Sequence, residues 1–331
     1  MREIGRRIDL SRLILILSVS AVVAYGYVNR VDRPNFESRL ELHSQIIAGT
    51  APSPYRYRVL VPFIAEGFTK ALSAVFPLKI SFLLAYAIYD LLAVCFLLVT
   101  LFFWLRTWFD GDQSLIGVLF VAGTMPIALQ DHYFQPWSLL EAGLFTAALL
   151  AIHRQRYWLL VSLVILASLN RETAIFIPMT FLLAIDTRTI LHTRSAREWK
   201  PVLLFGALLL IWTAVFFGLR YILGSVSLLG AVGGLLAHNT TRGSLFYTFV
   251  NAGLLLGGFW VFTLMGLKYA PTYIKRIVLV IPFYLITVMI WGVWYEVRLL
   301  MPLYAVLVAL GLSFLYLRKP TEQPANNWQP K

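Results

Sequence analysis

Eleven strongly apolar stretches fill most of this 331-residue chain, and they constrain its fold more than any other feature. Hydrophobic residues make up 59% of the chain, charged residues make up 13%, and mean hydropathy is +0.75. Soluble domains carry about 25% charged residues, so this composition excludes an ordinary soluble protein. A bilayer core offers no water to unpaired backbone groups, and helices satisfy those groups internally. The sequence therefore predicts an all-α polytopic membrane protein.

Ten of the stretches are long enough to cross a bilayer core about 30 Å thick, with allowance for tilt and frayed ends. The predicted spans are 13–29, 80–105, 114–130, 137–152, 157–169, 173–187, 202–223, 245–267, 276–294 and 299–317. The eleventh stretch, 59–76, is interrupted by Pro62, Glu66, Gly67 and Lys70. We expect it to form a re-entrant or interfacial helix.

Loop charges predict the orientation of these spans. With a cytoplasmic N-terminus, 17 of the 28 Lys and Arg fall on inside segments, as the positive-inside rule expects. Counting 59–76 as a span would move the basic clusters at 188–200 and 268–276 outside. We predict a multi-pass protein of the cytoplasmic (inner) membrane with both termini cytoplasmic and an uncleaved N-terminal signal anchor. The net charge of +12 is thus a topology signal, and no nucleic-acid partner is expected.

The same topology divides the chain into a transmembrane domain, 1–318, and a tail, 319–331. The tail is polar and contains three prolines, so we expect it to be a disordered cytoplasmic segment. The first outer loop, 29–79, is the longest segment on the outer side. The only cysteine, Cys95, excludes a disulfide or a multi-cysteine metal site within one chain.

A helical period runs from Phe36 to Ile47 in the first outer loop. Apolar residues share one arc of this segment, and Glu37 and Glu41 share the opposite arc, one turn apart. This pattern predicts an amphipathic interfacial helix on the outer leaflet. Arg39 and His43 fall within the apolar arc, which indicates that this face meets protein. For each single acid here, a solvated surface role is the alternative to a catalytic one.

The run Tyr55-Arg56-Tyr57-Arg58 follows this helix, between Pro54 and Pro62. The prolines stiffen the approach to the membrane. Arginines alternating with tyrosines can bind a phosphate and stack on a ring or a lipid head group. The alternative is an aromatic belt with snorkelling arginines.

Further polar residues lie in the short turns predicted on the outer side. They are Asp131, His132, Asn170, Arg171, Glu172, Glu296 and Arg298. Asp131 and His132 could bind a sugar hydroxyl or, with the loop acids, a divalent cation, although no cofactor is certain and no metal site is assigned. Asp90 and Glu141 lie inside apolar stretches, where acids are functional hypotheses by default. Asn239-Thr240-Thr241 matches a glycosylation sequon, but so short a match arises readily by chance.

Several of these segments resemble the GT-C superfamily of polyprenyl-phosphate-sugar-dependent membrane glycosyltransferases, in its bacterial form. The resemblance lies in Glu37 at the start of a loop helix, Gly49 twelve residues later, and the Pro54-Tyr55 entry to the next apolar segment. The turn 167–178 and the segment Trp294-Tyr-Glu296-Val-Arg298-Leu-Leu-Met-Pro302 are similar to later parts of such enzymes. The chain departs from familiar members because its first loop lacks a paired acid and it has no large C-terminal outer domain.

The resemblance implies transfer of a sugar from a polyprenyl-phosphate donor to a hydroxyl of a lipid or glycan acceptor, with inversion, on the extracytoplasmic face. A loop carboxylate would be the general base, with Glu37 as the leading candidate, followed by Asp32 and then Glu41. The phosphate ligands would be Arg56, Arg58, Arg171 and Arg298. Glu172 and Glu296 would orient neighbouring arginines, with direct catalysis as the alternative.

Two other functions fit a membrane protein with many charged outer residues. A transporter or flippase of lipid-linked sugars would place charges at the midplane of repeated halves with broken helices. Here the charges lie toward one face, and no fixed-period repeat is evident. A polymerase or ligase acting on lipid-linked glycans would keep the outer arginines and change the reaction.

Overall fold

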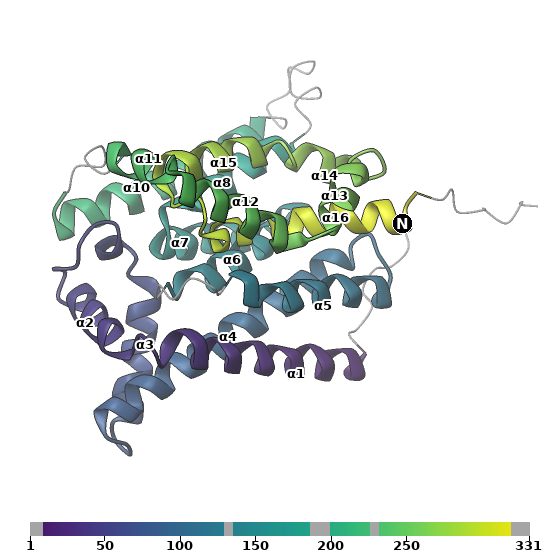
Figure 1. The fold of residues 1–331 in the computed structure, drawn as a ribbon. Coiled ribbons are helices and arrows are strands. Elements are labelled where there is room, and N and C mark those ends of the chain that lie inside the picture. Colours follow the sequence, from purple (N-terminus) through teal and green to yellow (C-terminus); the bar gives the residue numbers. More distant parts are fainter. Residues whose placement is uncertain (1–8, 129–134, 186–198, 226–231, 319–331) are drawn as a thin grey trace, which may run out of the picture.

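The computed structural model describes residues 9–128, 135–185, 199–225 and 232–318. Every regular element in these ranges is a helix, and most helices run along one common direction (Figure 1). Six helices are long and apolar enough to cross a membrane, or seven if one bent pair counts as a single span. The predicted class, an α-helical membrane protein, is therefore confirmed, whereas the count of ten spans remains a prediction.

The six long helices account for much of the bundle. They are α1 (Leu10–Tyr27) with the π-helical turn η1 (Val28–Asp32), α4 (Leu78–Leu105), α5 (Gly111–Ala128), α10 (Lys200–Leu223), α14 (Thr272–Ile277) with α15 (Val280–Trp291), and the 3-10 helix η5 (Val297–Leu303) with α16 (Tyr304–Tyr316). The bent pair is α12 (Arg242–Leu256) and α13 (Phe259–Gly266), which meet at 75°. Gly257 occupies the break with a φ of 51°, a conformation that glycine adopts without strain.

Three further predicted spans are helical but shorter than the bilayer core requires. They are α6 (Trp137–His153), α7 (Tyr157–Asn170), and the pair η3 (Glu172–Ile175) and α8 (Phe176–Ala184). Predicted and observed boundaries agree within a few residues for all ten stretches. A helix shorter than about 20 residues can still reach across a membrane when its ends are covered by protein.

The first outer loop folds into three short helices, α2 (Phe36–Ile47), η2 (Tyr55–Tyr57) and α3 (Leu60–Leu72). The predicted helix over 36–47 is confirmed, and Arg39 and His43 are buried against protein while Glu37 and Glu41 remain exposed. Its location on the outer leaflet remains a prediction. Helix α3 has 13 residues and packs against α4. Its length agrees with the prediction that 59–76 does not form a separate span. One more short helix, α11 (Val232–Asn239), precedes α12.

The core of the bundle is centred on α4, α6 and α16. In the apolar stretch formed by η5 and α16, 83% of the residues are buried. Trp104 on α4 is fully buried and donates a hydrogen bond from Nε1 to the Ala305 carbonyl over 2.8 Å. Helices α13 and α16 approach closely at Gly266 and Gly311. Small residues at such crossings let backbones come near, which is how helices pack tightly in membranes.

The two ends of the bundle collect different loops, as the predicted alternation requires. At one end, the run 55–58 contacts residue 137, Glu172 and the last turn of α10. At the other end, Arg12 pairs with Asp112 over 3.0 Å, and Trp108 stacks on Tyr273. The predicted outer loops thus meet one another, and so do the predicted inner ones.

Candidate functional site

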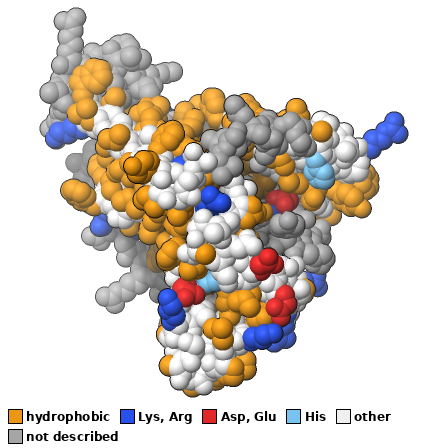
Figure 2. Space-filling model, turned by 90° about the vertical axis from the view of Figure 1, so that its left-hand side faces the viewer, with side chains coloured by type: hydrophobic (Ala, Val, Ile, Leu, Met, Phe, Trp, Pro, Cys, Tyr) orange, Lys and Arg blue, Asp and Glu red, His pale blue; other side chains and the backbone are white. Residues whose placement is uncertain are grey.

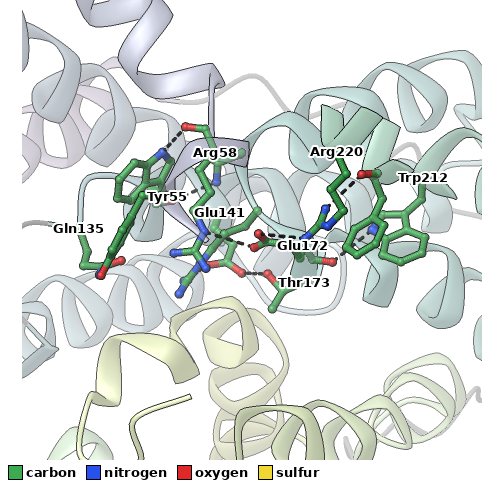
Figure 3. A network of polar contacts seen from close by, with 12 residues as sticks. Tyr55, Arg58, Gln135, Glu141, Glu172, Thr173, Trp212 and Arg220 are labelled. Atoms are coloured by element: carbon green, nitrogen blue, oxygen red, sulfur yellow. Dashed lines mark hydrogen bonds and ion pairs between the residues drawn. The ribbon is translucent and has the colours of Figure 1, made fainter. Parts of the chain in front are cut away.

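Three buried or half-buried arginines and two glutamates form a network where the first outer loop meets α6, α7 and α10 (Figure 3). Arg58 donates from Nε to Glu172 Oε2 over 3.2 Å, and the Nη2 atom of Arg220 lies 3.9 Å from Glu172 Oε1. Burial lowers the pKa of Arg58, and the charge of Glu172 opposes that effect. Glu172 therefore lies between two guanidinium groups that come from distant parts of the chain. We call these residues, together with Arg171 and Glu141, the arginine network.

The deeper half of the arginine network is the ion pair between Arg171 and Glu141. Arg171 Nη1 donates to Glu141 Oε2, and the Thr173 hydroxyl donates to Glu141 Oε1. Both charged side chains are at least nine-tenths buried. Glu141 sits in the second turn of α6, so the predicted intramembrane acid has a structural partner in Arg171. An ion pair this enclosed is retained only when its hydrogen bonds are well satisfied.

Aromatic and amide groups form one wall of the arginine network. Tyr55 stacks on Trp137 with ring centroids 5.7 Å apart, and Gln135 donates to the Tyr55 hydroxyl over 3.0 Å. Trp137 donates from Nε1 to the Arg58 carbonyl over 2.9 Å, while Asn170 donates to the Trp137 carbonyl over 3.1 Å. These contacts fix the backbone on both sides of Arg58. The guanidinium of Arg58 is held separately, by its hydrogen bond to Glu172.

The arginine network carries more positive than negative charge. Among the described residues, Arg58, Arg171 and Arg220 face Glu141 and Glu172, which leaves one positive charge in excess within that part of the chain. Several guanidinium N–H groups also lack a hydrogen-bond acceptor among the described residues, including Nε of Arg171 and Nε of Arg220. Buried donors without acceptors are costly, and an anionic oxygen is the acceptor that suits them best.

A second polar cluster lies between η1, α2 and α4. Asp32 forms an ion pair with Arg39, and the carboxyl group of Asp90 lies beside that of Asp32. All three side chains are at most 1% exposed. Arg39 also lies over the ring of Tyr86, with its guanidinium carbon 3.8 Å from the ring centroid. We call Asp32, Arg39 and Asp90 the acid cluster, because its carboxyl groups outnumber its cation.

His43 links the acid cluster to the surface. Its Nδ1 atom lies 3.0 Å from the Tyr86 hydroxyl, and its Nε2 atom lies 3.1 Å from Glu66 Oε2. Burial lowers the pKa of His43, and the hydrogen bond with Glu66 opposes that shift. Partial burial raises the pKa of Glu66, but hydrogen bonds from His43 and Lys70 outweigh it, and the pKa lies below its usual value.

Tyr89, Pro136 and Trp137 link the helix turn that carries Asp90 to the arginine network. Tyr89, which directly precedes Asp90, donates from its hydroxyl to the Pro136 carbonyl over 2.8 Å. Pro136 is followed by Trp137, whose indole is bonded to the Arg58 carbonyl. Asp90 was expected in the middle of a span, but this contact places it level with the first turn of α6. Helix α4 has 28 residues, so its first turns extend beyond that level.

Arg298 and Glu296 form a third polar feature, at the start of η5. Their side chains are paired, and Arg298 Nε and Nη1 have no acceptor within the described part of the chain. Arg298 is 5% exposed and acts electrostatically on Tyr27, which also senses Asp32 and Asp90. The predicted pairing of Glu296 with its neighbouring arginine is confirmed.

Two asparagines hold the segment that leads into η5. Asn239 donates from Nδ2 to the Gly292 carbonyl over 2.8 Å and accepts from the Trp294 N–H over 3.1 Å. Asn251 donates to the Tyr295 carbonyl over 3.1 Å. Asn239 has no exposed surface, so its sequon match marks a structural residue. The two side-chain amides thereby fix the position of the backbone that leads to Glu296 and Arg298.

The predicted site residues thus lie in different places. Glu37 is 76% exposed and pairs with Lys79 over 3.3 Å, and Glu41 accepts a hydrogen bond from Gln45 over 3.2 Å at the surface. In Figure 2, which looks onto the end that carries α2 and α3, acidic and basic side chains gather among hydrophobic ones. Of the three acids predicted as candidates for the general base, Asp32 is the one that lies inside a buried polar cluster.

The remaining predicted residues are accounted for as follows. Arg58, Asn170, Arg171 and Glu172 belong to the arginine network or its wall, and Arg298 and Glu296 pair with each other at the start of η5. Arg56 donates to the Ala51 and Leu223 carbonyls over 2.8 and 3.1 Å, which gives it a structural role in the loop. Asp131 and His132 lie outside the described residues.

Sequence reasoning missed Arg220 as a site residue. It lies in the last turns of an apolar helix, and its guanidinium carbon is 3.5 Å from the Phe216 ring centroid and 4.3 Å from that of Tyr57. A charged residue inside an apolar span is itself a functional signal, and that signal was available in the sequence. Among the described residues, no group of three or more His, Cys, Asp or Glu is placed to hold a metal ion.

No protein-family model, no curated protein and no solved structure matches this chain.

Proposed function

We propose that this protein is a membrane glycosyltransferase that moves a sugar from a polyprenyl-phosphate donor to a lipid or glycan hydroxyl on the extracytoplasmic face. The observation that carries the proposal is the opposite charge imbalance, among the described residues, of two polar clusters that are linked through Tyr89, Pro136 and Trp137. The arginine network has an excess positive charge with donors lacking acceptors, and the acid cluster has an excess carboxyl group. Group transfer from phosphate to a hydroxyl needs both, a cationic site for the departing phosphate and a carboxylate for the hydroxyl proton.

The arginine network is the proposed phosphate site. Guanidinium groups bind phosphate through two parallel hydrogen bonds and stay charged beside lipid. Arg58 and Arg220 approach Glu172 from opposite sides, so an anionic oxygen could replace or join that carboxylate. Stacked Tyr55 and Trp137 supply an aromatic surface of the kind that sugars and lipid heads contact.

Asp32 is the proposed general base, in preference to the exposed Glu37 and Glu41. In the reaction, the Asp32 carboxylate takes the proton of the acceptor hydroxyl, and the acceptor oxygen bonds to the anomeric carbon. The bond from that carbon to the phosphate oxygen breaks at the same time, and its electron pair leaves with polyprenyl phosphate. Attack from the face opposite the phosphate inverts the anomeric centre. Asp32 has no exposed surface, so the acceptor reaches it only when η1 or α2 moves.

A transfer assay in proteoliposomes tests the proposal. Purified protein is given radiolabelled polyprenyl-phosphate sugars with a membrane lipid extract as acceptor. We expect Asp32→Asn to lower the transfer rate at least about 100-fold, because general bases contribute that much or more, while donor binding is retained. Arg298, whose Nε and Nη1 lack an acceptor among the described residues, is a further proposed phosphate ligand, and Arg298→Ala should weaken donor binding. Asp112→Asn, an identical change at the other end of the bundle, should be as active as the parent.

Glu37→Gln and Glu41→Gln test the two exposed acids in the same assay. Full transfer by Asp32→Asn, together with loss of transfer in Glu37→Gln, would return the role of base to Glu37. Full transfer by all three variants would remove carboxylate catalysis from the proposal.

One observation favours a transporter or flippase of lipid-linked sugars instead. Helices α12 and α13 are bent by 75° at Gly257, and broken helices are typical of transporters. The polar clusters nevertheless lie at helix ends. Movement of a fluorescent lipid-linked sugar between leaflets, measured without an acceptor, separates the two functions. A polymerase or ligase would show the same donor binding and require a glycan acceptor.

A further inference from the structure

The Glu172 carboxylate and the Arg220 guanidinium face each other without a direct hydrogen bond (Figure 3). Their nearest atoms, Oε1 and Nη2, lie 3.9 Å apart, whereas a charge-assisted bond between such groups measures about 2.7–2.9 Å. Both atoms are buried, and neither has another hydrogen-bond partner among the described residues. A buried donor and a buried acceptor thus lie side by side unsatisfied, which is costly unless a third group bonds to both.

Contacts to other groups hold each member of this pair. The guanidinium carbon of Arg220 lies 3.5 Å from the centre of the Phe216 ring and 4.3 Å from that of the Tyr57 ring. Its Nη1 atom donates to the Phe216 carbonyl over 3.1 Å, which leaves Nε and Nη2 without an acceptor in the described part of the chain. Glu172 Oε2 accepts from Arg58 Nε over 3.2 Å. The separation of Oε1 from Nη2 is therefore maintained from both ends.

A hydroxyl group is the ligand chemistry that satisfies both atoms. Its oxygen accepts a hydrogen bond from Arg220 Nη2, and its O–H donates to Glu172 Oε1. Two hydrogen bonds of about 2.8 Å that meet at one oxygen at about a right angle span about 4 Å, which matches the 3.9 Å separation. An anionic oxygen placed between the two atoms would satisfy Arg220 alone and would repel the Glu172 carboxylate.

The aromatic wall of the arginine network suits a carbohydrate. The guanidinium carbon of Arg58, which shares Glu172 with Arg220, lies 5.7 Å from the Tyr55 ring centre and 5.8 Å from that of Trp137. A sugar presents apolar C–H faces together with hydroxyl groups, so aromatic rings near unsatisfied polar atoms match it. The side chain of Glu172 is 25% exposed, and a ligand can approach the pair from that side.

We propose that Glu172 and Arg220 bind one hydroxyl of the sugar that the lipid donor carries, and so form a sugar subsite within the arginine network. The inference rests on the proposed function, because the sugar is the group that a transferase receives on its lipid phosphate. The neighbouring phosphate then bonds to other donors of the network, among them Arg171 Nε, which has no acceptor among the described residues. The position of one hydroxyl thereby becomes a determinant of which sugar is accepted.

Equilibrium binding to the full-length protein in lipid nanodiscs tests the sugar subsite without any acceptor. The four probes are polyprenyl phosphate and its glucose, galactose and mannose derivatives. We expect at least one sugar derivative to bind about tenfold or more tightly than polyprenyl phosphate itself, because hydrogen bonds to charged groups contribute that much. Equal affinities for the four probes would show that solvent alone bridges Glu172 and Arg220, and would overturn the proposal.

Two variants assign the sugar preference to this pair. Arg220→Met removes the donor and Glu172→Gln removes the charged acceptor, and we expect each to lower the preference about fivefold or more. Arg12→Met, the same change at the other end of the bundle, should leave the preference unchanged. Equal losses of affinity for polyprenyl phosphate and its sugar derivative in Arg220→Met would make Arg220 a phosphate ligand only and contradict the sugar subsite.

Glu172→Gln keeps the proposal falsifiable if Arg220→Met does not fold. Loss of a carboxylate near the phosphate should leave the affinity for polyprenyl phosphate unchanged or raise it, while the affinity for the sugar derivative falls. A rise in both affinities by the same factor would show that Glu172 opposes phosphate binding and contacts no sugar.

These results separate the sugar subsite from the transferase proposal. Binding is measured without turnover, so a sugar preference that depends on Arg220 can be established in a protein that transfers no sugar. Transfer that depends on Asp32 without any sugar preference would support the transferase and remove the sugar subsite. Failure to bind any of the four probes would contradict both.

Discussion

Arg58 and Glu172, 114 residues apart in the chain, are joined by a 3.2 Å contact between Nε and Oε2. This contact ties the first outer loop to the turn that follows α7. Glu172 also lies 3.9 Å from Arg220, so one carboxylate connects three segments that are distant in the sequence. The arginine network is consequently a tertiary feature, assembled from side chains that no local sequence motif contains.

Glu172→Gln should destabilise the protein by roughly 1–3 kcal/mol, because it leaves two arginines without their shared partner. Arg58→Gln should cost less, and the double variant should cost less than the sum of the two, since the residues interact directly. Denaturant unfolding in detergent measures all three. Lys79→Gln breaks the exposed pair with Glu37 and should have little effect. If the losses in unfolding free energy of Glu172→Gln and Arg58→Gln simply add in the double variant, the 3.2 Å contact contributes no coupling energy.

Asn239→Ala should lower the unfolding free energy by about 1–3 kcal/mol, because the Gly292 carbonyl and the Trp294 N–H lose their partners. It should also weaken donor binding through the displaced Arg298. Thr240→Ala, at the exposed neighbouring position, should change neither quantity appreciably. Expression in a host that glycosylates sequons should leave Asn239 unmodified; a glycan found there by mass spectrometry would contradict its burial.

Acidification should destabilise the protein through His43. Burial lowers the pKa of His43 below the unfolded value of about 6.5, so the unfolded chain takes up a proton that the folded protein resists. The effect is absent above about pH 6.5 and grows as pH falls from there to the folded pKa, by about 1.4 kcal/mol per unit. Tm measured from pH 8 to pH 5 should therefore fall less in His43→Gln than in the parent. The exposed His238→Gln serves as the control and should follow the parent curve.

Gly266→Ala and Gly311→Ala should each destabilise the crossing of α13 and α16. An added methyl at Gly266 would lie 1.9 Å from the Leu310 carbonyl oxygen, and one at Gly311 would lie 2.1 Å from the Phe259 ring. Overpacking of this kind costs typically about 1–3 kcal/mol. Gly253→Ala, where a methyl meets nothing within 4 Å, is the matched control in α12 and should be tolerated. Tm in detergent measures the three variants.

Cysteines at Ser44 and Asp112 should react from opposite sides of the membrane in a Cys95→Ser background. Both positions are exposed, and they lie at the two different ends of the bundle. A membrane-impermeant maleimide applied to intact cells should label Ser44→Cys and spare Asp112→Cys until the membrane is opened. The reverse pattern would invert the predicted orientation, and equal labelling would contradict the assignment of the two ends.

Much of the fold could be predicted from hydropathy alone. The ten apolar stretches are helical within a few residues of their predicted ends, because apolar runs bounded by polar loops leave the backbone few alternatives. Helix α2 was predicted from its period, including the burial of Arg39 and His43. The break between α12 and α13 could not be predicted as a 75° bend, since adjacent glycines permit a bend without specifying its angle.

The site was less accessible to sequence reasoning than the fold. Arg171, Glu172 and Arg298 were identified by their position in short outer turns, and the structure places them in buried ion pairs. Period and spacing favoured Glu37, which lies on the exposed face of α2. Asp32 and Asp90 meet only because η1 and α4 are neighbours, and Arg220 joins Glu172 only because α10 ends there. Such pairings depend on helix packing, which one sequence does not reveal.

Only 6% of the residues in the apolar stretch of helix α10 are buried. The polar contacts of this helix with the rest of the protein come from Trp212, Arg220 and the carbonyls at its C-terminal end. We therefore expect lipid to cover most of the remaining apolar surface of this helix. A harsh detergent that lets α10 splay would draw Arg220 away from Glu172 while the rest of the bundle stayed folded. Extraction in native lipid is thus the condition under which the arginine network should survive purification intact.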